Sequence, residues 1–260
     1  MPLLEISDLS KSFGGNRAVD AVNFNVAPGE IAGLVGPNGA GKSTVFNLIT
    51  GFIRPDSGIV KLKGKEITGL RPDQIAMRGV GRTFQITLLF HGQTVLDSLL
   101  AGHVRQERTG FWQAFFNSGA YREERKQAFE KSLEVLDFMG LTEWKGTQVN
   151  VLPPGIQRFL GIAQVIMSPV DILLLDEPFT GMNEEEISDL LGKLKKLQSR
   201  GTSILVIEHH MKAVMTLCER VVVINFGQKI AEGTPQEISS NPVVIEAYLG
   251  HKKGRSAGAS

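Results

Sequence analysis

The sequence is organised around one stretch, Gly36-Pro37-Asn38-Gly39-Ala40-Gly41-Lys42-Ser43-Thr44. An apolar run at residues 31–35 precedes it, and a second apolar run at residues 45–49 follows it. This order predicts a strand, a glycine-rich loop and a helix, with the G-x-x-x-x-G-K-[ST] spacing of a phosphate-binding loop. An ordinary glycine-rich turn that happens to precede a lysine is the alternative, and the flanking strand and helix disfavour it.

The chemistry of this loop suits a triphosphate. Gly36, Gly39 and Gly41 carry no Cβ, so backbone N–H groups can turn inward. Together with the positive end of the following helix, these donors form an anion site. Lys42 is predicted to reach the β- and γ-phosphates, and the Ser43 hydroxyl to ligate Mg²⁺. We therefore predict a bound nucleoside triphosphate, held by Gly36, Asn38, Gly39, Ala40, Gly41, Lys42, Ser43 and Thr44.

Composition limits the other possibilities. The chain has 260 residues, enough for one large domain or a core with a smaller lobe. Its 28 basic and 27 acidic residues nearly balance, which gives no whole-chain attraction to nucleic acid or anionic lipid. Cys218 is the single cysteine and indicates a reducing compartment. Neither a signal peptide nor a membrane-spanning run is visible, so we expect any membrane role to act through partners.

Further strands and helices surround the loop. Alternating residues predict antiparallel strands at 3–6 and 21–26, and a hairpin with its turn at Phe226-Gly227. Other strands are predicted at 58–62, 81–85, 171–175 and 203–207. Helical periodicity covers residues 90–152, with one stripe at Val95, Leu99, Leu100 and Val104 and another at Phe129, Leu133 and Leu136. The aromatic segment 109–116 is either a small satellite core or an exposed docking surface.

Two acidic residues follow the strand predicted at 171–175. Four consecutive apolar residues before Asp176 and Glu177 indicate a strand covered on both faces, as in a parallel sheet. Carboxyl ends of such strands are where α/β sheets bind their ligands. In the next helix Asn183 is the predicted N-cap, and Ile187, Leu190, Leu191, Leu194 and Leu197 form the buried stripe. Phe13, before two glycines, is either a base-stacking aromatic or an ordinary core residue.

In this order the motifs resemble the ATPase subunits of ABC transporters. The resemblance covers residues 3–250 and includes the phosphate loop, Gln85 after Arg82-Thr83-Phe84, Asp176-Glu177 before Pro178, and His209 after a strand. Within that superfamily the chain looks like the subgroup that powers uptake of branched-chain and other hydrophobic amino acids. The pointers are Arg82-Thr83-Phe84-Gln85, Ile207-Glu208-His209, Gly181-Met182-Asn183 and the ending Glu246-Ala247-Tyr248-Leu249-Gly250. Importers of urea and amides share these features.

The resemblance implies residue roles. Glu177 resembles the residue that orients and polarises the attacking water, and Asp176 the carboxylate that organises Mg²⁺ beside Ser43. Gln85 resembles the residue that senses γ-phosphate and metal, and His209 the histidine that contacts γ-phosphate. His209 and His210 are adjacent on an extended segment, so they point to opposite faces and do not readily share a metal. The implied catalytic set is Glu177, His209 and Gln85, and the implied metal set is Ser43, Gln85 and Asp176; ATP and Mg²⁺ are the implied cofactors.

One segment departs from the family pattern. Where this superfamily usually has Leu-Ser-Gly-Gly-Gln, a surface that closes over the ATP of a partner subunit, this chain has Leu152-Pro153-Pro154-Gly155-Ile156. Pro153 removes a hydroxyl donor and Pro154 removes a backbone N–H, while Gly155 keeps its N–H. Hydrogen bonds to charged groups contribute roughly 1.5–3 kcal/mol each. We therefore predict that Pro153, Pro154 and Gly155 form a weakened nucleotide contact and that the chain pairs with a different ATPase subunit.

The implied fold is α/β: a P-loop NTPase core of the ABC ATPase type with a mostly parallel sheet, an N-terminal antiparallel β subdomain and an inserted α-helical lobe. The expected ranges are 1–86 and 156–235 for the core, 87–155 for the lobe, 236–250 for a C-terminal helix and 251–260 for a disordered tail. The implied function is ATP hydrolysis that drives an importer at the cytoplasmic face of the inner membrane. Its expected partners are a second, non-identical ATPase subunit, membrane permeases and, indirectly, a solute-binding protein. The alternatives are a catalytically weak regulatory module and a soluble ABC ATPase acting on ribosomes or DNA.

Overall fold

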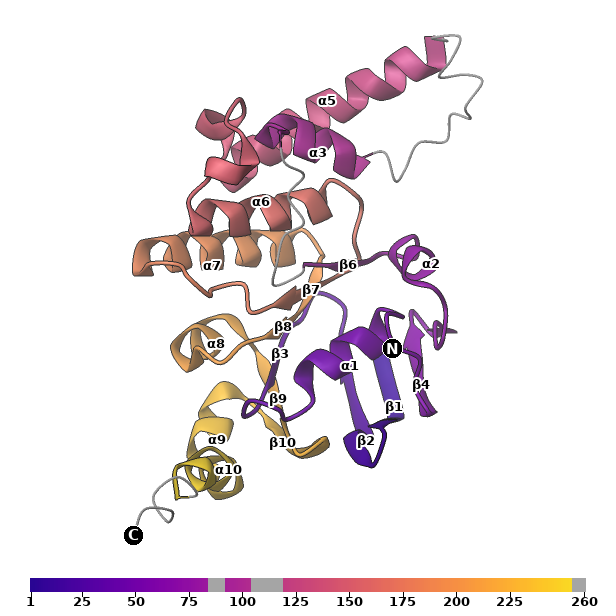
Figure 1. Ribbon diagram of the computed structural model, residues 1–260, viewed down its shortest axis with the longest axis vertical. Coiled ribbons are helices and arrows are strands. Elements are labelled where there is room, and N and C mark those ends of the chain that lie inside the picture. The colour runs from indigo at the N-terminus through magenta and orange to yellow at the C-terminus, as the bar shows by residue number, and fades with distance from the viewer. Residues whose placement is uncertain (84–91, 104–118, 254–260) are drawn as a thin grey trace. The chain divides into compact units, whose positions relative to one another are not determined.

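The computed structural model describes residues 1–83, 92–103 and 119–253 of the chain (Figure 1). Chain contacts divide it into two compact units. The first contains Met1–Arg82, Asp171–Pro178 and Leu194–Ser260, and the second contains Thr83–Val170 and Phe179–Lys193. The phosphate loop and both acidic residues of the Asp176-Glu177 pair belong to the first unit.

A six-stranded sheet forms the centre of the first unit. Its order is β10-β9-β3-β8-β7-β6, and every neighbouring pair is parallel except β9 and β10. All residues of β3, β7 and β8 are buried, which confirms the expectation of strands covered on both faces. The strands are β3 (Ile31–Val35), β6 (Val80–Arg82), β7 (Ile172–Asp176), β8 (Ser203–Ile207), β9 (Arg220–Asn225) and β10 (Gln228–Gly233).

A second, four-stranded sheet in the same unit is antiparallel, as predicted, in the order β2-β1-β4-β5. Its first two strands are much longer than the alternating segments that predicted them. The strands are β1 (Leu4–Phe13), β2 (Asn16–Val26), β4 (Ser57–Leu62) and β5 (Lys65–Glu66). The Phe226-Gly227 turn between β9 and β10 is confirmed, and both of its residues have positive φ, 46° and 79°.

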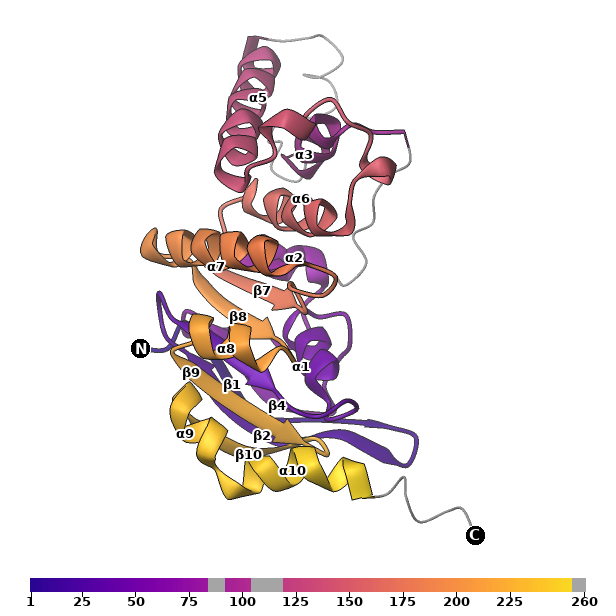
Figure 2. The ribbon, with the colours of Figure 1, turned by 90° about the vertical axis from the view of Figure 1, so that its left-hand side faces the viewer.

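Helix α1 (Lys42–Ile49) lies between the two sheets, while α8 (Met211–Leu217) covers the other face of the six-stranded sheet (Figures 1 and 2). The main core joins both sheets through α1, whose Phe46 and Val45 are fully buried. The unit also contains α2 (Pro72–Ala76), α9 (Pro235–Ser240) and α10 (Pro242–Lys253). Helix α10 continues to Lys253, three residues beyond the expected end of the C-terminal helix at 250, and residues 254–260 lie outside the described part.

The named elements of the second unit are all helices in the part of the chain that the structure describes. They are α3 (Val95–His103), α5 (Gly119–Met139), α6 (Pro154–Ile166), the short helices η2 (Thr142–Trp144) and η3 (Val149–Val151), and the first part of α7 (Glu184–Ser199). In α3, Val95 and Leu99 are buried as predicted. Asn183 caps α7 as predicted: its Oδ1 accepts the Glu186 N–H at 2.9 Å, and its own N–H donates to the Glu186 carboxylate. Val104 and the aromatic segment 109–116 lie outside the described residues.

The predicted apolar stripe of α5 is partly wrong. Leu136 is buried, but Phe129 and Leu133 are 44% and 39% exposed. The buried face instead includes Ala128 and Ser132. The same buried face continues with Val135, Leu136 and Met139, so only its first part is formed by small side chains. Among the described helices, none has the length and apolar character needed to cross a bilayer.

Candidate functional site

The phosphate loop joins β3 to α1 and depends on two glycines. A Cβ at Gly36 would collide with the backbone carbonyl of Ile224 on β9. Gly41 is the N-cap of α1 in the left-handed conformation, with φ 102°, and its carbonyl accepts the Val45 N–H at 3.0 Å. Only glycine takes this conformation without strain. The sequence therefore forms a tight loop whose amides stand at the positive end of a helix.

Lys42 lies beneath this loop. Its Nζ donates to the carbonyl oxygens of Gly36 and Pro37, at 2.7 and 2.9 Å. Burial lowers the pKa of Lys42, while the nearby charges of Glu177 and Asp176 act in the opposite direction. The structure thus places the lysine of the loop within electrostatic reach of both acidic residues that follow β7.

Asp176 and Glu177 occupy different environments at the end of β7. Asp176 is buried, and burial raises its pKa while Arg82 counteracts the rise. Glu177 is more accessible, and its φ of 49° is a conformation uncommon for residues other than glycine. Its N–H donates to the Ile207 carbonyl at 2.9 Å, which holds the turn in place. The first carboxylate is therefore fixed in the interior, while the second faces a more open space.

His209 approaches Glu177 from the neighbouring strand. Its Nδ1 lies 3.7 Å from Glu177 Oε1, an ion-pair distance when the imidazole is protonated. The segment that carries it is fixed by Glu208, whose buried carboxylate accepts the N–H groups of His209 and His210. Parallel pairing of β7 with β8 brings these residues together, although they are distant in sequence.

The available donors suit Mg²⁺ bound together with a nucleotide. Ser43 supplies an exposed hydroxyl after the loop, and Asp176 supplies a carboxylate. Among the described residues no group of three or more His, Cys, Asp or Glu side chains could hold a metal. Mg²⁺ usually takes one or two protein oxygens and completes its octahedron with water and phosphate oxygens. This donor set fits that mode of binding.

Three other parts of the chain were predicted to contact the nucleotide: Phe13, Gln85 and residues 153–155. Phe13 is 48% exposed, so it is not a core residue, and Lys11 Nζ lies 5.8 Å from its ring centre. Gln85 lies outside the described residues. Pro153, Pro154 and Gly155 lie in the second unit, where Pro153 is the N-cap of α6 and Pro154 its first residue. The helix therefore forms despite the two prolines, because proline has no N–H to leave unpaired in a first turn.

Sequence reasoning missed two residues of the site: one beside Asp176 and one near the phosphate loop. Arg82, at the end of β6, donates to Asp176 from a buried position. Tyr248, on α10, lies near the loop: burial raises its pKa, and the N–H of Gly36 partly offsets that rise. An arginine directly after apolar strand residues was a visible signal for the first. No local pattern pointed to the second, because α10 and the loop are separated by most of the chain.

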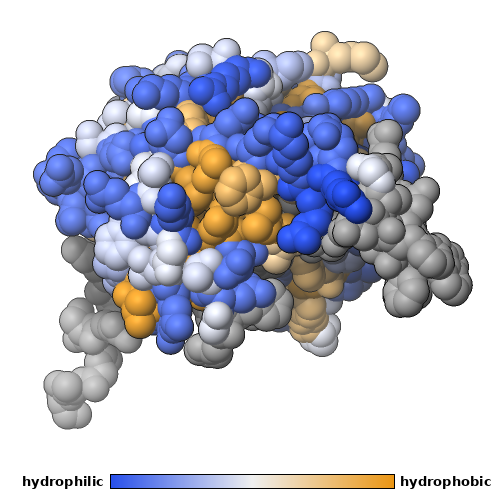
Figure 3. Space-filling model, turned by 90° about the horizontal axis from the view of Figure 1, so that it is seen from above, coloured by the Kyte–Doolittle hydropathy of each residue, from blue (hydrophilic) through white to orange (hydrophobic). Residues whose placement is uncertain are grey.

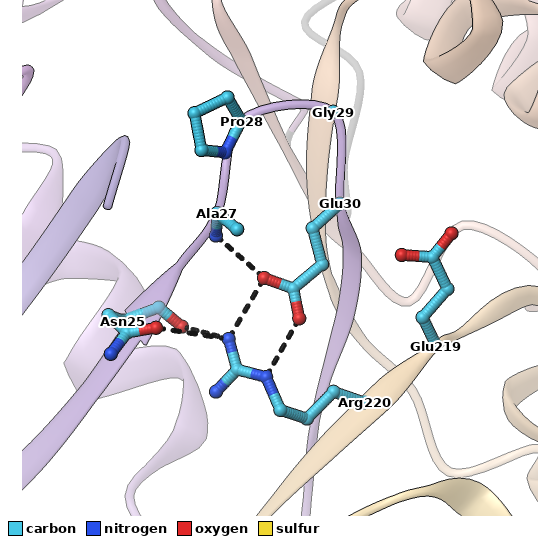
Figure 4. Close-up of a pocket in the computed structure, with 7 residues that line it drawn as sticks. All are labelled: Asn25, Ala27, Pro28, Gly29, Glu30, Glu219 and Arg220. Carbon is cyan, nitrogen blue, oxygen red and sulfur yellow. Dashed lines mark hydrogen bonds and ion pairs between the residues drawn. The ribbon is translucent and has the colours of Figure 1, made fainter. Parts of the chain in front are cut away.

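A hollow at the opposite end of β3 is not a second binding site (Figure 4). It surrounds Arg220, whose Nε and Nη2 donate to the two carboxylate oxygens of Glu30 at 2.7 and 2.9 Å. Nη2 also donates to the Asn25 carbonyl, and Nη1 to Glu232. Arg220, Glu30 and Glu232 satisfy one another and tie strands together, while the Glu219 carboxylate, which also lines the hollow, accepts from Gln198 Nε2 at 2.6 Å.

The fold and the loop define the class: an α/β nucleotide-binding protein of the phosphate-loop type. Comparison with known proteins defines the family, since residues 19–180 match the ABC transporter family. The chain belongs to the ABC transporter family and is an ATP-binding ATPase of it. Residues 228–253 additionally match a family described as branched-chain amino acid ATP-binding cassette transporter.

Two relatives and one solved structure show how far the similarity extends. The high-affinity branched-chain amino acid transport ATP-binding protein BraF of Pseudomonas aeruginosa is 43% identical over 96% of this chain and 98% of its own length. LivG of Escherichia coli K12, with the same description, is 42% identical over the same shares. A nucleotide-free ATP-binding cassette from an ABC transporter superposes with a TM-score of 0.85, at 30% identity, covering 96% of this chain and all of the other.

Proposed function

We propose that this chain hydrolyses ATP to drive uptake of branched-chain amino acids, or of a related small solute such as urea or an amide. The observation that carries the proposal is its similarity to BraF and LivG over 96% of the chain. The match of residues 228–253 to the branched-chain amino acid cassette family supports it independently of the nucleotide-binding motifs. Because selectivity resides in other subunits, ATP hydrolysis is the step that this chain contributes.

The residues of the first unit suggest how they divide the work. The loop amides and Lys42 would hold the phosphates, and Ser43 with Asp176 would hold Mg²⁺, which neutralises charge that develops on the phosphoryl group. Glu177 would orient and polarise a water molecule, and its greater accessibility than Asp176 and its distance of 3.7 Å from His209 support this role. Phe13 offers an exposed ring on which a nucleobase can stack.

ABC importer ATPases dimerise and act with membrane permeases, and we propose both for this chain, at the cytoplasmic face of the inner membrane. The view from above shows an apolar patch among hydrophilic residues (Figure 3). On α5, Phe129 and Leu133 are exposed large apolar side chains. Exposed apolar side chains such as these two indicate a protein interface, and we assign the face of α5 that carries them to the permease subunits. A solute-binding protein would act through those permeases.

We further propose that the two ATPase subunits differ. Pro153 and Pro154 remove two donors from the surface that would face a partner's nucleotide, and a third feature adds to this. The Glu186 carboxylate lies so close to Gly155 that a Cβ there would collide with it. A carboxylate at the N-terminal end of α6 competes with phosphate for the same positive field. A partner with an intact signature would complete the site that contains Lys42 and Glu177.

The test is ATP hydrolysis by the native assembly, purified with its permeases and any second ATPase. Glu177→Gln keeps the size of the side chain but removes the carboxylate, so we expect turnover to fall roughly 10²–10³-fold while ATP still binds. Exchange of the exposed Glu66 for Gln on β5 is the control and should leave turnover unchanged. Equal turnover in the wild type and Glu177→Gln assemblies would favour the regulatory alternative.

A further inference from the structure

Arg82 is held from two sides in the interior of the first unit. Its Nη1 donates to Asn47 Oδ1 and to Thr50 Oγ1, both at 2.8 Å. Both acceptors lie at the end of α1, the helix that the phosphate loop opens. Its Nη2 lies 3.2 Å from Asp176 Oδ2 at the end of β7. The guanidinium therefore connects the nucleotide-binding helix to the carboxylate predicted to organise the metal.

Two aromatic rings fix the plane of this guanidinium. Its central carbon lies 5.6 Å from the ring centre of Phe46 and 5.7 Å from that of Phe52. These are cation–π distances, and they favour a planar, delocalised cation over a compact ammonium. Groups other than Asp176 therefore orient the forked Arg82 guanidinium, and its Nη2 group points at the Asp176 carboxylate.

This arrangement does more than neutralise a buried charge. Arg82 and Asp176 have side chains only 8% and 5% exposed, so each carries a desolvation cost that the pair must offset. Buried ion pairs of this kind often add little to stability, because desolvation consumes most of their attraction. Such pairs do fix the relative orientation of the two side chains, because a buried charged group has few other partners of opposite charge within reach. Asp176 is the residue for which fixed geometry matters chemically.

We propose that Arg82 is a positioning residue that holds the Asp176 carboxylate in the orientation in which it receives Mg²⁺ with ATP. The inference rests on the proposed function, because it assigns Asp176 to the metal. Arg82 itself touches neither nucleotide nor metal in this proposal. Its contacts to Asn47 and Thr50 make the position of Asp176 depend on the helix that binds the phosphates.

The experiment measures ATP binding to the purified full-length chain by calorimetry, once in EDTA and once in saturating Mg²⁺. The ratio of the two dissociation constants is the gain from Mg²⁺. In Arg82→Met we expect binding in EDTA to stay within about twofold of wild type, since the loop and Lys42 are unchanged, and the gain from Mg²⁺ to fall at least fivefold. Arg82→Lys keeps the charge without the fork and should not restore the gain. Arg71→Met, at an exposed arginine paired with Asp73, is the matched control and should behave as wild type.

A second variant keeps the test decisive if Arg82→Met unfolds. Thr50→Val removes one anchor of Nη1 but leaves both charges, and we expect it to lower the gain about twofold to threefold. In the assembly, the Mg²⁺ concentration for half-maximal hydrolysis should rise while KM for ATP changes less. The proposal would be overturned if the Arg82 variants gained as much ATP affinity from Mg²⁺ as the wild type, or more. It would also be overturned if Mg²⁺ raised the ATP affinity of neither the wild type nor the variants. Absence of ATP binding by the wild type would instead overturn the proposed function.

Discussion

Lys42 shows how one side chain can carry a testable share of nucleotide affinity. Its Nζ is buried and bonded to two loop carbonyls, so the ammonium is already confined next to the loop amides. Confinement lowers the entropy lost when a phosphate oxygen takes the place of a carbonyl. Removal of the Lys42 ammonium should therefore cost the binding free energy of a charge-assisted hydrogen bond to the phosphate. This loss is larger than the loss expected from removing one surface charge.

We expect Lys42→Ala to weaken ATP binding roughly 10–100-fold, corresponding to about 1.5–3 kcal/mol for a hydrogen bond to a charged group. Titration calorimetry with the purified chain measures this directly. Lys126→Ala, at an exposed position on α5, removes the same charge far from the loop in sequence and should leave affinity unchanged. Unchanged affinity in Lys42→Ala would remove the basis for the nucleotide site.

At the level of single residues, the sequence best predicted those features that depend on residues nearby in the chain. The loop glycines, Lys42 and the capping Asn183 follow from spacing over a few residues. Arg82 was missed as a partner of Asp176, because their contact depends on the parallel pairing of β6 with β7, which joins residues far apart in the chain. The roles predicted for Glu177, His209 and Gln85 stay predictions, and Gln85 lies outside the described residues.

At the scale of elements, the phosphate loop depends on the strand beside it. β9 supplies the Ile224 carbonyl that leaves no room for a Cβ at Gly36, and the turn after β9 donates from Gly227 N–H to the Ala40 carbonyl at 3.0 Å. The loop is therefore shaped by a hairpin as well as by its own glycines. A change that shifts the loop relative to β9 should affect folding and nucleotide binding together.

Gly36→Ala tests this dependence. Since the added methyl would collide with backbone, we expect a loss of about 2 kcal/mol or more of unfolding free energy and weaker ATP binding. Urea unfolding and calorimetry measure the two effects. In Gly192→Ala, on α7, the methyl meets open space, and a gain of about 0.5–1 kcal/mol is expected from the better helix former. A neutral Gly36→Ala would show that the loop relaxes freely.

Strand prediction succeeded where burial is uniform, and helix-face prediction failed where it is not. Runs of buried apolar residues identified β3, β7 and β8 because parallel strands covered on both faces have no polar side. In α5 the largest apolar residues were expected inside, yet Phe129 and Leu133 are exposed, while Ser132 is fully buried with its hydroxyl donating to the Ala128 carbonyl. A side chain that satisfies its own polar group within the helix can be buried at little cost.

For the whole molecule, the central question is whether the protein works with a copy of itself or with a different subunit. The first unit contains the phosphate loop, Lys42, Ser43 and Asp176, the groups that we propose hold the phosphates and the metal. The second unit begins α6 with two prolines and has a carboxylate beside Gly155. A homodimer would contain two sites that share this weakness, whereas a heterodimer would contain one.

We expect the chain alone to hydrolyse ATP slowly, and mixing with a partner ATPase that has an intact signature to raise turnover at least tenfold. The variant Pro153→Ser with Pro154→Gly restores two donors and should raise the activity of the chain alone; adding Glu186→Gln should raise it further. Steady-state ATPase assays at several mixing ratios measure these effects. Full activity of the unmixed wild type, insensitive to these substitutions, would contradict the unequal-site proposal.

The contacts of the loop with Ile224, Gly227 and Tyr248 also set an order of events during synthesis. The loop is translated well before the β9–β10 hairpin and α10, which complete its surroundings. Fragments that end before β9 should therefore carry the full motif and still fail to retain nucleotide. Nucleotide retention by a nascent chain would therefore report that translation has passed β9 and β10.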